Sequence, residues 1–266
     1  MMGVIHDWET PRLGLLYWLL IAEGFVIFLS NILTLITFAT NRALRKRSTY
    51  FLIAVAAADA MVGLAAIFCY SFVLIDKYIS GWRFAGDVLW IACSTASING
   101  LVLIAMERLH ATVRPLRHRQ VQPRAYFYGI VAQWAIALPL GLSYAATDEA
   151  IITIWSRNVL AFSSLAVICC SYFIILVNVR KQRIKLSHPS TRRDRELAET
   201  LFIVTALSLV TWLPDLIFHE IPRYTRFLLA HELVMAWRLL NSVVNPVVYA
   251  LRMPDFRKAM VKIVCS

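Results

Sequence analysis

Polar side chains that could hold a small cation recur inside stretches of the sequence that are otherwise apolar. One is a carboxylic acid, Asp59, and the others carry hydroxyl or amide oxygens: Asn31, Ser97, Asn241, Ser242 and Asn245. A charged residue near the centre of a bilayer costs about 2.5 to 3.5 kcal/mol on insertion scales, so a retained one suggests a function. If these side chains converge, an ionised Asp59 among oxygen atoms suits a small hard cation and water. The spacing supports equally well a set of hydrogen bonds that joins helices around a protonated Asp59.

A second pair of residues could form a switch. Glu107 and Arg108 are adjacent at the end of an apolar run, where an acid and an arginine can pair until something withdraws the arginine. An isolated, solvated pair of this kind contributes little stability, so Glu107 and Arg108 could also be an ordinary charge pair with no function.

A tryptophan and a proline lie deep inside another apolar run and predict a pivot. Pro214 removes a backbone hydrogen bond and kinks its helix two residues after Trp212. Asp215 and His219 follow Trp212 at steps of three and four, so all three occupy one stripe that points outward from the pivot. Trp212 could instead be simple packing bulk.

The charged residues beside this pivot outline a candidate ligand pocket. Trp90, Ser94 and Ser97 follow one another at steps of four and three and share a helix face. Arg238 and Asp215 are both expected to point into the interior about one turn above the pivot, where an unpaired charge is expensive. They should therefore either form a permanent salt bridge or bind a polar ligand.

The end of the chain carries a basic amphipathic segment, residues 255–262, in which Phe256 and Met260 share a face with the following Ile263. That pattern is typical of a short helix lying on the anionic inner leaflet of a membrane. Cys265, just beyond it, is a candidate for acylation, although a lone cysteine near a terminus is more often unmodified.

The elements that must position these residues are membrane-spanning helices. The chain of 266 residues is 59% hydrophobic with a mean hydropathy of +0.65, which is too apolar for a soluble domain of this size. Runs of about 20 apolar residues, the length that crosses a bilayer, occur seven times. We therefore predict an all-α fold, a seven-transmembrane helix bundle followed by a short amphipathic eighth helix, with spans at 13–39, 50–75, 86–107, 126–146, 151–179, 197–219 and 230–250.

Basic residues predict the orientation of the bundle. Of the 27 Lys and Arg residues, 20 lie in the alternate segments 41–50, 107–125, 180–200 and 251–266. The positive-inside rule puts these segments in the cytoplasm. We expect a single domain, 1–266, in which 1–12 is an extracellular N-terminus, 13–250 holds the seven helices, and 251–266 forms the membrane-surface helix and a short cytoplasmic tail.

The same patterns argue against other classes of protein. The net charge of +11 sits between apolar runs rather than on one polar domain, so it indicates membrane orientation and no nucleic-acid partner. The six histidines are scattered, which gives no metal cluster or nucleophile–base pair for an enzyme. A transporter would need a relay of intramembrane acids or an inverted repeat, and neither is visible.

Taken together, the motifs resemble those of the rhodopsin-like (class A) G protein-coupled receptors. One motif stands in each predicted span, in order: Asn31, Ala57-Ala58-Asp59, Glu107-Arg108, Trp134, Tyr172, Trp212-Leu213-Pro214 and Asn245-Pro246-Val247-Val248-Tyr249. No single motif is decisive, but seven in register across the whole chain are very specific.

The resemblance implies a plasma-membrane receptor, with no enzymatic activity and no required cofactor. It would pass the binding of an unknown extracellular small molecule, lipid or peptide to a heterotrimeric G protein, as the span 197–219 swings outward. Tyr172, Pro246 and Tyr249 would belong to the activation switch, and Asp194 would hold Arg108. The family's inner sodium site maps onto Asp59, Ser97, Asn241, Ser242 and Asn245, which favours the cation interpretation.

Several positions depart from the family pattern. Leu109 and His110 follow Arg108 where a tyrosine is common, and Arg83 replaces the cysteine of the usual outer disulfide. Ser164 stands near the position of a missing proline. These departures and a short outer loop resemble the branch of melanocortin, lipid and adenosine receptors. Trp90 stands where amine receptors carry an aspartate, and the last span has no lysine for retinal.

Overall fold

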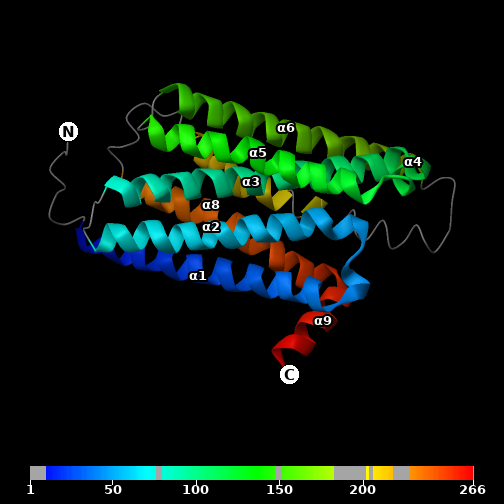
Figure 1. Ribbon diagram of the computed structural model, residues 1–266, viewed down its shortest axis with the longest axis horizontal. Helices are drawn as coiled ribbons and strands as arrows, with labels where there is room; N and C mark the ends of the chain where they lie inside the picture. The colour runs from blue at the N-terminus through cyan, green and yellow to red at the C-terminus, as the bar shows by residue number, and fades with distance from the viewer. Residues whose placement is uncertain are drawn as a thin grey trace.

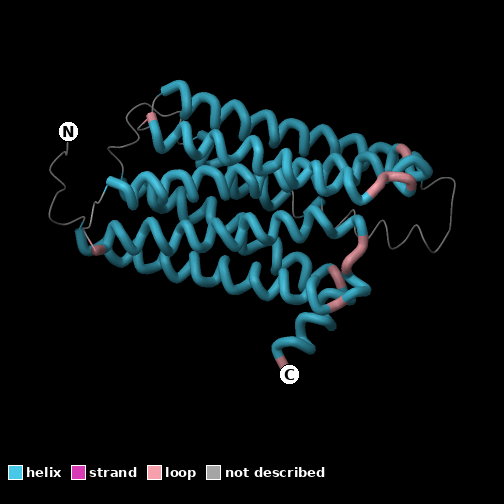
Figure 2. Tube along the Cα trace, viewed as in Figure 1, coloured by secondary structure: helices cyan, strands magenta, loops and turns pink. Residues whose placement is uncertain are grey.

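The computed structural model describes residues 10–75, 80–147, 151–182, 202–203, 206–217 and 228–265, and all regular structure in these residues is helical. Figures 1 and 2 show the long helices side by side in one bundle. The elements are α1 (Thr10–Thr40), the 3-10 turns η1 (Arg42–Leu44) and η2 (Arg47–Thr49), α2 (Tyr50–Leu74), α3 (Ser80–Val113), α4 (Pro115–Arg119), α5 (Pro123–Ala146), α6 (Ile151–Gln182), the helix Ala206–Ile217, α8 (Leu228–Arg252) and α9 (Pro254–Val264).

Six of the described helices are long and apolar enough to cross a membrane, and Ala206–Ile217 is a shorter apolar helix inside the predicted span 197–219. The prediction of an all-helical transmembrane bundle is confirmed. Several helices run beyond the predicted apolar stretches: α3, for instance, begins at Ser80 and ends at Val113 rather than covering 86–107. Hydropathy marks only the part in hydrocarbon, whereas backbone hydrogen bonding continues into the polar interface.

The helix α3 forms the centre of the bundle, because it packs against α2 on one side and against α5 and α6 on the other. The helix α1 packs against α2 and α8, so the first and last spans are neighbours. This arrangement brings α2, α3 and α8, which carry most of the predicted cation site, into contact around the bundle axis.

Glycines allow α1 and α2 to approach closely. A Cβ atom added at Gly63 would lie 2.7 Å from both Gly24 O and Phe28 N, which is closer than real Cβ contacts. Small residues at such crossings let backbones pack tightly in a bilayer, where the hydrophobic effect does not drive helices together.

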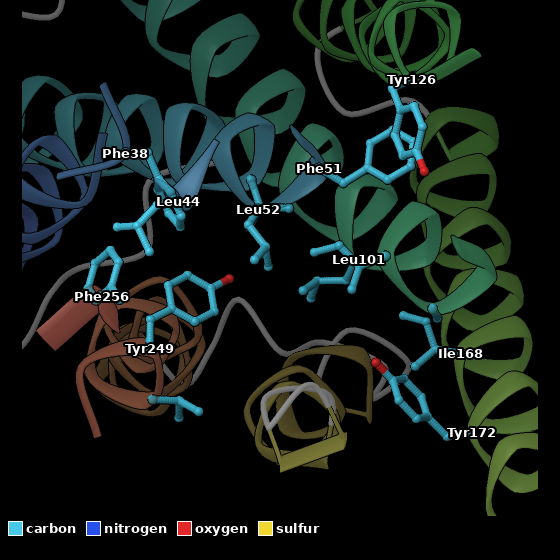
Figure 3. Close-up of a cluster of buried hydrophobic side chains, with 14 of the residues drawn as sticks. Phe38, Leu44, Phe51, Leu52, Leu101, Tyr126, Ile168, Tyr172, Tyr249 and Phe256 are labelled. Carbon is cyan, nitrogen blue, oxygen red and sulfur yellow. The ribbon is translucent and has the colours of Figure 1, made fainter. Parts of the chain in front are cut away.

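A buried apolar cluster fills the end of the bundle that carries α9. Figure 3 shows Phe38, Leu52, Leu101 and Tyr249 turned toward one another from α1, α2, α3 and α8. Phe256 of α9 is fully buried in this cluster, with its ring centroid 5.2 Å from that of Phe38. The short amphipathic helix is therefore present as predicted, but Phe256 anchors it in the bundle rather than in lipid.

Candidate functional site

Asp59 of α2 is completely buried and accepts three hydrogen bonds from two other helices. Ser97 Oγ of α3 donates to Oδ1 at 2.6 Å, and Ser242 Oγ of α8 donates to the same oxygen at 2.8 Å. Asn245 Nδ2 of α8 donates to Oδ2 at 2.7 Å. Asn31 of α1 joins the network from outside, since its Nδ2 donates to the backbone oxygen of Ser242 at 3.0 Å. The structure thus brings together four helices around one carboxylate.

Oxygen atoms remain available in this network. The side-chain oxygens of Asn31 and Asn245 are buried without a hydrogen-bond partner among the described residues. A polar cavity with room for about one water molecule adjoins the network. It is lined by Val62, Ser94, Ser97, Trp212, Arg238, Leu239, Asn241 and Ser242. A carboxylate with free carbonyl-type oxygens and a small polar cavity is a donor set that fits a hard monovalent cation.

One residue of the predicted pair of charges, Arg238, lines this cavity, and its partner Asp215 lies behind it. Arg238 Nε of α8 lies 3.7 Å from Asp215 Oδ2, and both side chains are buried. The guanidinium carbon of Arg238 lies 4.8 Å from the ring centroid of Trp90 and 5.4 Å from that of Trp212. Two indole faces and one carboxylate therefore surround the charge of Arg238, which offsets part of the expense of burying it.

Trp212 and Ser94 both line this cavity. Trp212 is buried in a cluster with Ile98 of α3, Leu165 of α6 and Leu216, and it also lines the cavity. Ser94 is buried on α3 and lines the same cavity. Trp212 therefore both packs in the core and forms part of the cavity wall.

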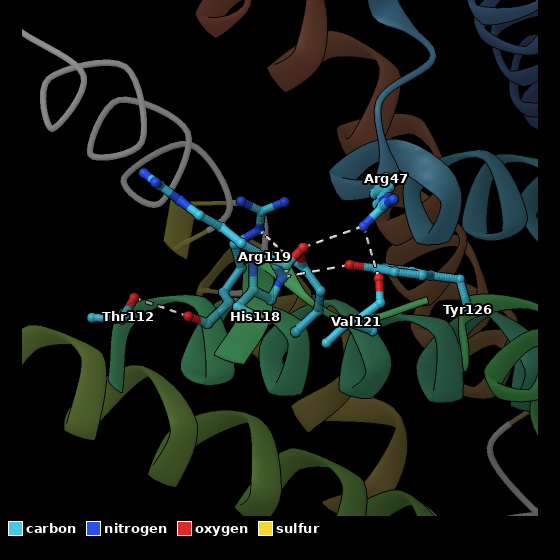
Figure 4. Close-up of polar contacts among 8 residues, drawn as sticks. Arg47, Thr112, His118, Arg119, Val121 and Tyr126 are labelled. Carbon is cyan, nitrogen blue, oxygen red and sulfur yellow. Dashed lines mark hydrogen bonds and ion pairs between the residues drawn. The ribbon is translucent and has the colours of Figure 1, made fainter. Parts of the chain in front are cut away.

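At the other end of α3, Glu107 binds two partners. Glu107 Oε2 lies 2.7 Å from Arg108 Nε, and Glu107 Oε1 lies 2.9 Å from His118 Nε2, which belongs to the short helix α4. Tyr126 Oη of α5 lies 3.4 Å from the same histidine nitrogen. Nearby, Arg47 Nη1 donates to the backbone oxygen of Val121 at 2.9 Å (Figure 4). The Glu107–Arg108 pair is thus buried and embedded in a larger polar network rather than solvated.

Two tyrosines of the predicted switch are buried in the apolar cluster near this end. Figure 3 shows Tyr249 of α8 and Tyr172 of α6 on opposite sides of the cluster. Tyr172 packs edge-on against Phe202 at 5.8 Å between ring centroids. Pro246 lies inside α8, near the C-terminal end of that helix, and Pro214 lies inside Ala206–Ile217.

The structure does not describe every predicted position. Asp194 and His219 lie outside the described residues, as does the side chain of Arg83. Cys265 is exposed directly after α9, and all five cysteines are free thiols.

The sequence analysis missed several polar residues that the structure brings into these networks. His118 was counted only as one scattered histidine, and Gln133, which donates from Nε2 to the Ala96 backbone oxygen at 2.7 Å, carried no motif. Trp237 donates from Nε1 to the Val210 backbone oxygen at 3.0 Å. A polar residue inside an apolar run was a usable signal for Gln133, but none pointed to the partners of His118 or Trp237.

Comparisons with known proteins give one consistent result. Residues 30–149 match the sequence pattern of the family described as "7 transmembrane receptor (rhodopsin family)". The chain is 25% identical to human lysophosphatidic acid receptor 3 over 288 residues, which cover 98% of this chain and 82% of that receptor. It is 26% identical to bovine adenosine receptor A2b, covering 88% and 84% of the two chains. It is 25% identical to cannabinoid receptor 1 of Xenopus laevis, covering 89% and 60%.

Proposed function

We infer that the chain is a member of the rhodopsin-like family of seven-transmembrane receptors, whose sequence pattern matches residues 30–149. We propose that it passes the binding of an extracellular ligand to a heterotrimeric G protein through outward movement of the helix Ala206–Ile217. The family is one of receptors, not enzymes, and its members are multi-pass membrane proteins that signal through G proteins. The ligand of this chain is unidentified.

One observation carries the proposed mechanism. A single cavity is lined by Trp212 and Arg238 and also by Ser97 and Ser242, which both donate hydrogen bonds to Asp59. A ligand that moves Arg238 or Trp212 therefore changes the wall of the Asp59 network directly. Coupling between the two sites needs only this shared wall.

The proposed ligand pocket consists of Trp90, Ser94, Asp215, His219 and Arg238. It is supported by the burial of Asp215 and Arg238 and by the two indole rings against the guanidinium. A permanent salt bridge between the Ala206–Ile217 helix and α8 remains the competing role for the charged pair.

The proposed switch is at the other end of the bundle. The Glu107–Arg108 pair, at 2.7 Å, would hold the closed state, with Asp194 as a further partner for the arginine. Movement of the Ala206–Ile217 helix about Pro214 would release Arg108 toward the G protein, while Tyr172, Tyr249 and the kink at Pro246 rearrange in the apolar cluster. The buried positions of both tyrosines in one cluster support this assignment.

We also propose that sodium binds at Asp59, Ser97, Asn241, Ser242 and Asn245 as an allosteric ion. The support is the donor set: one carboxylate, two hydroxyls and amide oxygens beside a polar cavity. The ion would favour the closed bundle only to the extent that it binds that state more tightly.

The orientation is likewise a proposal. The distribution of Lys and Arg supports an extracellular N-terminus, 1–12, and a cytoplasmic tail within one domain, 1–266. An exposed Cys265 next to a basic amphipathic helix supports acylation there, which would add a second membrane signal to α9.

The direct test of receptor function is nucleotide exchange. The purified chain in nanodiscs is mixed with G protein heterotrimers of each Gα class, and GTP-analogue binding is timed against empty nanodiscs. We expect one or more classes to exchange faster with the receptor. The proposal would be contradicted if, for every Gα class, exchange were equally fast with the receptor, with the Arg108→Ala variant and with empty nanodiscs.

A further inference from the structure

Pro214 leaves a backbone carbonyl of its own helix without the usual donor. In a regular α-helix, the N–H of residue 214 would bond to the carbonyl of Val210, but proline has no N–H. In the hydrocarbon core no bulk water can take the place of that donor. A kinked transmembrane helix therefore depends on neighbouring helices, side chains or ordered water to satisfy the freed group.

A side chain of α8 reaches this carbonyl. Trp237 Nε1 donates to Val210 O at 3.0 Å. The Trp237 side chain is 44% exposed on the surface of the bundle, inside the candidate span Leu229–Arg252. An indole has a single donor, and lipid tails offer it no acceptor, so the bond to Val210 satisfies both groups at once.

The neighbouring residues of α8 contact the same kink from the bundle interior. Arg238 lies 3.7 Å from Asp215, and Asn241 Oδ1 lies 3.5 Å from Thr211 Oγ1. The Thr211 hydroxyl is also within hydrogen-bond distance of the backbone oxygens of the preceding turn. One stretch of α8 therefore touches the kink on both its outer and its inner side.

We propose that Trp237 is a positioning residue, whose indole N–H replaces the N–H that Pro214 lacks and holds the kinked helix at its angle to α8. The structure has Glu107 paired with Arg108, so the held arrangement corresponds to the resting state of the proposed switch. Any pivoting of Ala206–Ile217 about Pro214 has to stretch or break the Trp237–Val210 bond. This goes beyond the proposed function, because the bond and its dependence on Pro214 exist whether or not a G protein binds.

The test is a double-mutant cycle at Trp237 and Pro214. Four receptors are compared in nanodiscs: wild type, Trp237→Phe, Pro214→Ala and the double variant. The control is Trp18→Phe, because Trp18 of α1 is also exposed, at 63%. The two readouts are the unfolding temperature and the rate of ligand-free nucleotide exchange per folded receptor.

We expect Trp237→Phe to lower the unfolding temperature and to raise ligand-free exchange about two- to tenfold, the change that one net hydrogen bond supports. Trp18→Phe should do neither. In the Pro214→Ala background the effect of Trp237→Phe should disappear, because the restored N–H of residue 214 bonds to Val210 O itself. Equal effects of Trp237→Phe in both backgrounds, or an effect no larger than that of Trp18→Phe, would overturn the proposal.

A second variant keeps the test decisive if Pro214→Ala does not fold. Trp237 is replaced by its benzothiophene analogue, in which sulfur takes the place of the N–H while the ring keeps its shape. The same fall in unfolding temperature and rise in exchange is expected, and wild-type behaviour in both would refute the role of the N–H. The unfolding readout needs no G protein, so it decides this inference even if receptor function fails its own test.

Discussion

Asp59 accepts hydrogen bonds from three neutral donors, none of which can neutralise the charge of a carboxylate. A buried carboxylate in this position therefore gains from a counter-ion more than an exposed one would. The proposed cation site depends on this gain, whereas hydrogen bonds that only join the helices would not require an ion.

We predict that sodium raises the unfolding temperature of the protein and that this rise requires Asp59. A site filled at ten times its dissociation constant contributes about 1.4 kcal/mol to stability. The wild-type unfolding temperature should rise when sodium chloride replaces choline chloride at equal ionic strength, and Asp59→Asn should abolish the rise. Asp255→Asn, on the exposed face of α9, is the matched control. A mutant that responds to sodium as the wild type does would leave only the helix-joining role.

Arg238 and Asp215 allow a second test on single residues. Removing one partner of a buried ion pair leaves the other charge unpaired and costs about 3 to 5 kcal/mol. We therefore expect Asp215→Ala and Arg238→Ala each to lower the unfolding temperature strongly. The exchanged variant, Asp215→Arg with Arg238→Asp, should recover much of that loss. If both single alanine variants unfold at the wild-type temperature, the two side chains do not depend on each other and the pocket needs a different outline.

Among the elements, α4 is too short to be stable alone, and its position depends on side-chain contacts. His118 connects it to Glu107 of α3 and to Tyr126 of α5. His118→Ala should therefore loosen α4 and speed hydrogen exchange in residues 115–121 about fivefold, the effect of losing about 1 kcal/mol. Arg117→Ala, at an exposed site of the same helix, should leave the exchange rates unchanged. Equal protection in both variants would mean that backbone packing alone holds this segment.

Helical periodicity predicted some of the contacts between helices but not others. Helical periodicity correctly put Ser97 on the face of α3 that meets Asp59, and Ser242 and Asn245 on the corresponding face of α8. Periodicity gives the face of one helix, but it does not give the rotation or height of its neighbour. The bond from Trp237 to Val210 and the contact of His118 with Glu107 depend on those quantities, which is why the sequence did not reveal them.

At the scale of the whole molecule, the two polar networks lie at different depths of one bundle and share α3. Ser94 and Ser97 face the outer cavity, while Glu107 and Arg108 end the same helix near α4. A change at the cavity can reach the other end through α3 directly or through the Ala206–Ile217 helix, for which we propose a pivot at Pro214. The second route is the one that the proline kink and the contacts of α8 favour, because a packed rigid helix such as α3 has no comparable pivot.

If a G protein responds to the release of Arg108, the rate of ligand-free nucleotide exchange should depend on the Glu107–Arg108 pair. Wild type, Glu107→Gln and Arg108→Ala are reconstituted at equal amounts of folded protein with the G protein that the wild type activates. Because Glu107→Gln removes the charge that pairs with Arg108, we predict about fivefold faster exchange, equivalent to about 1 kcal/mol in the switch equilibrium. Arg108→Ala should fall to the rate of empty nanodiscs. Identical exchange rates for all three receptors would contradict the account.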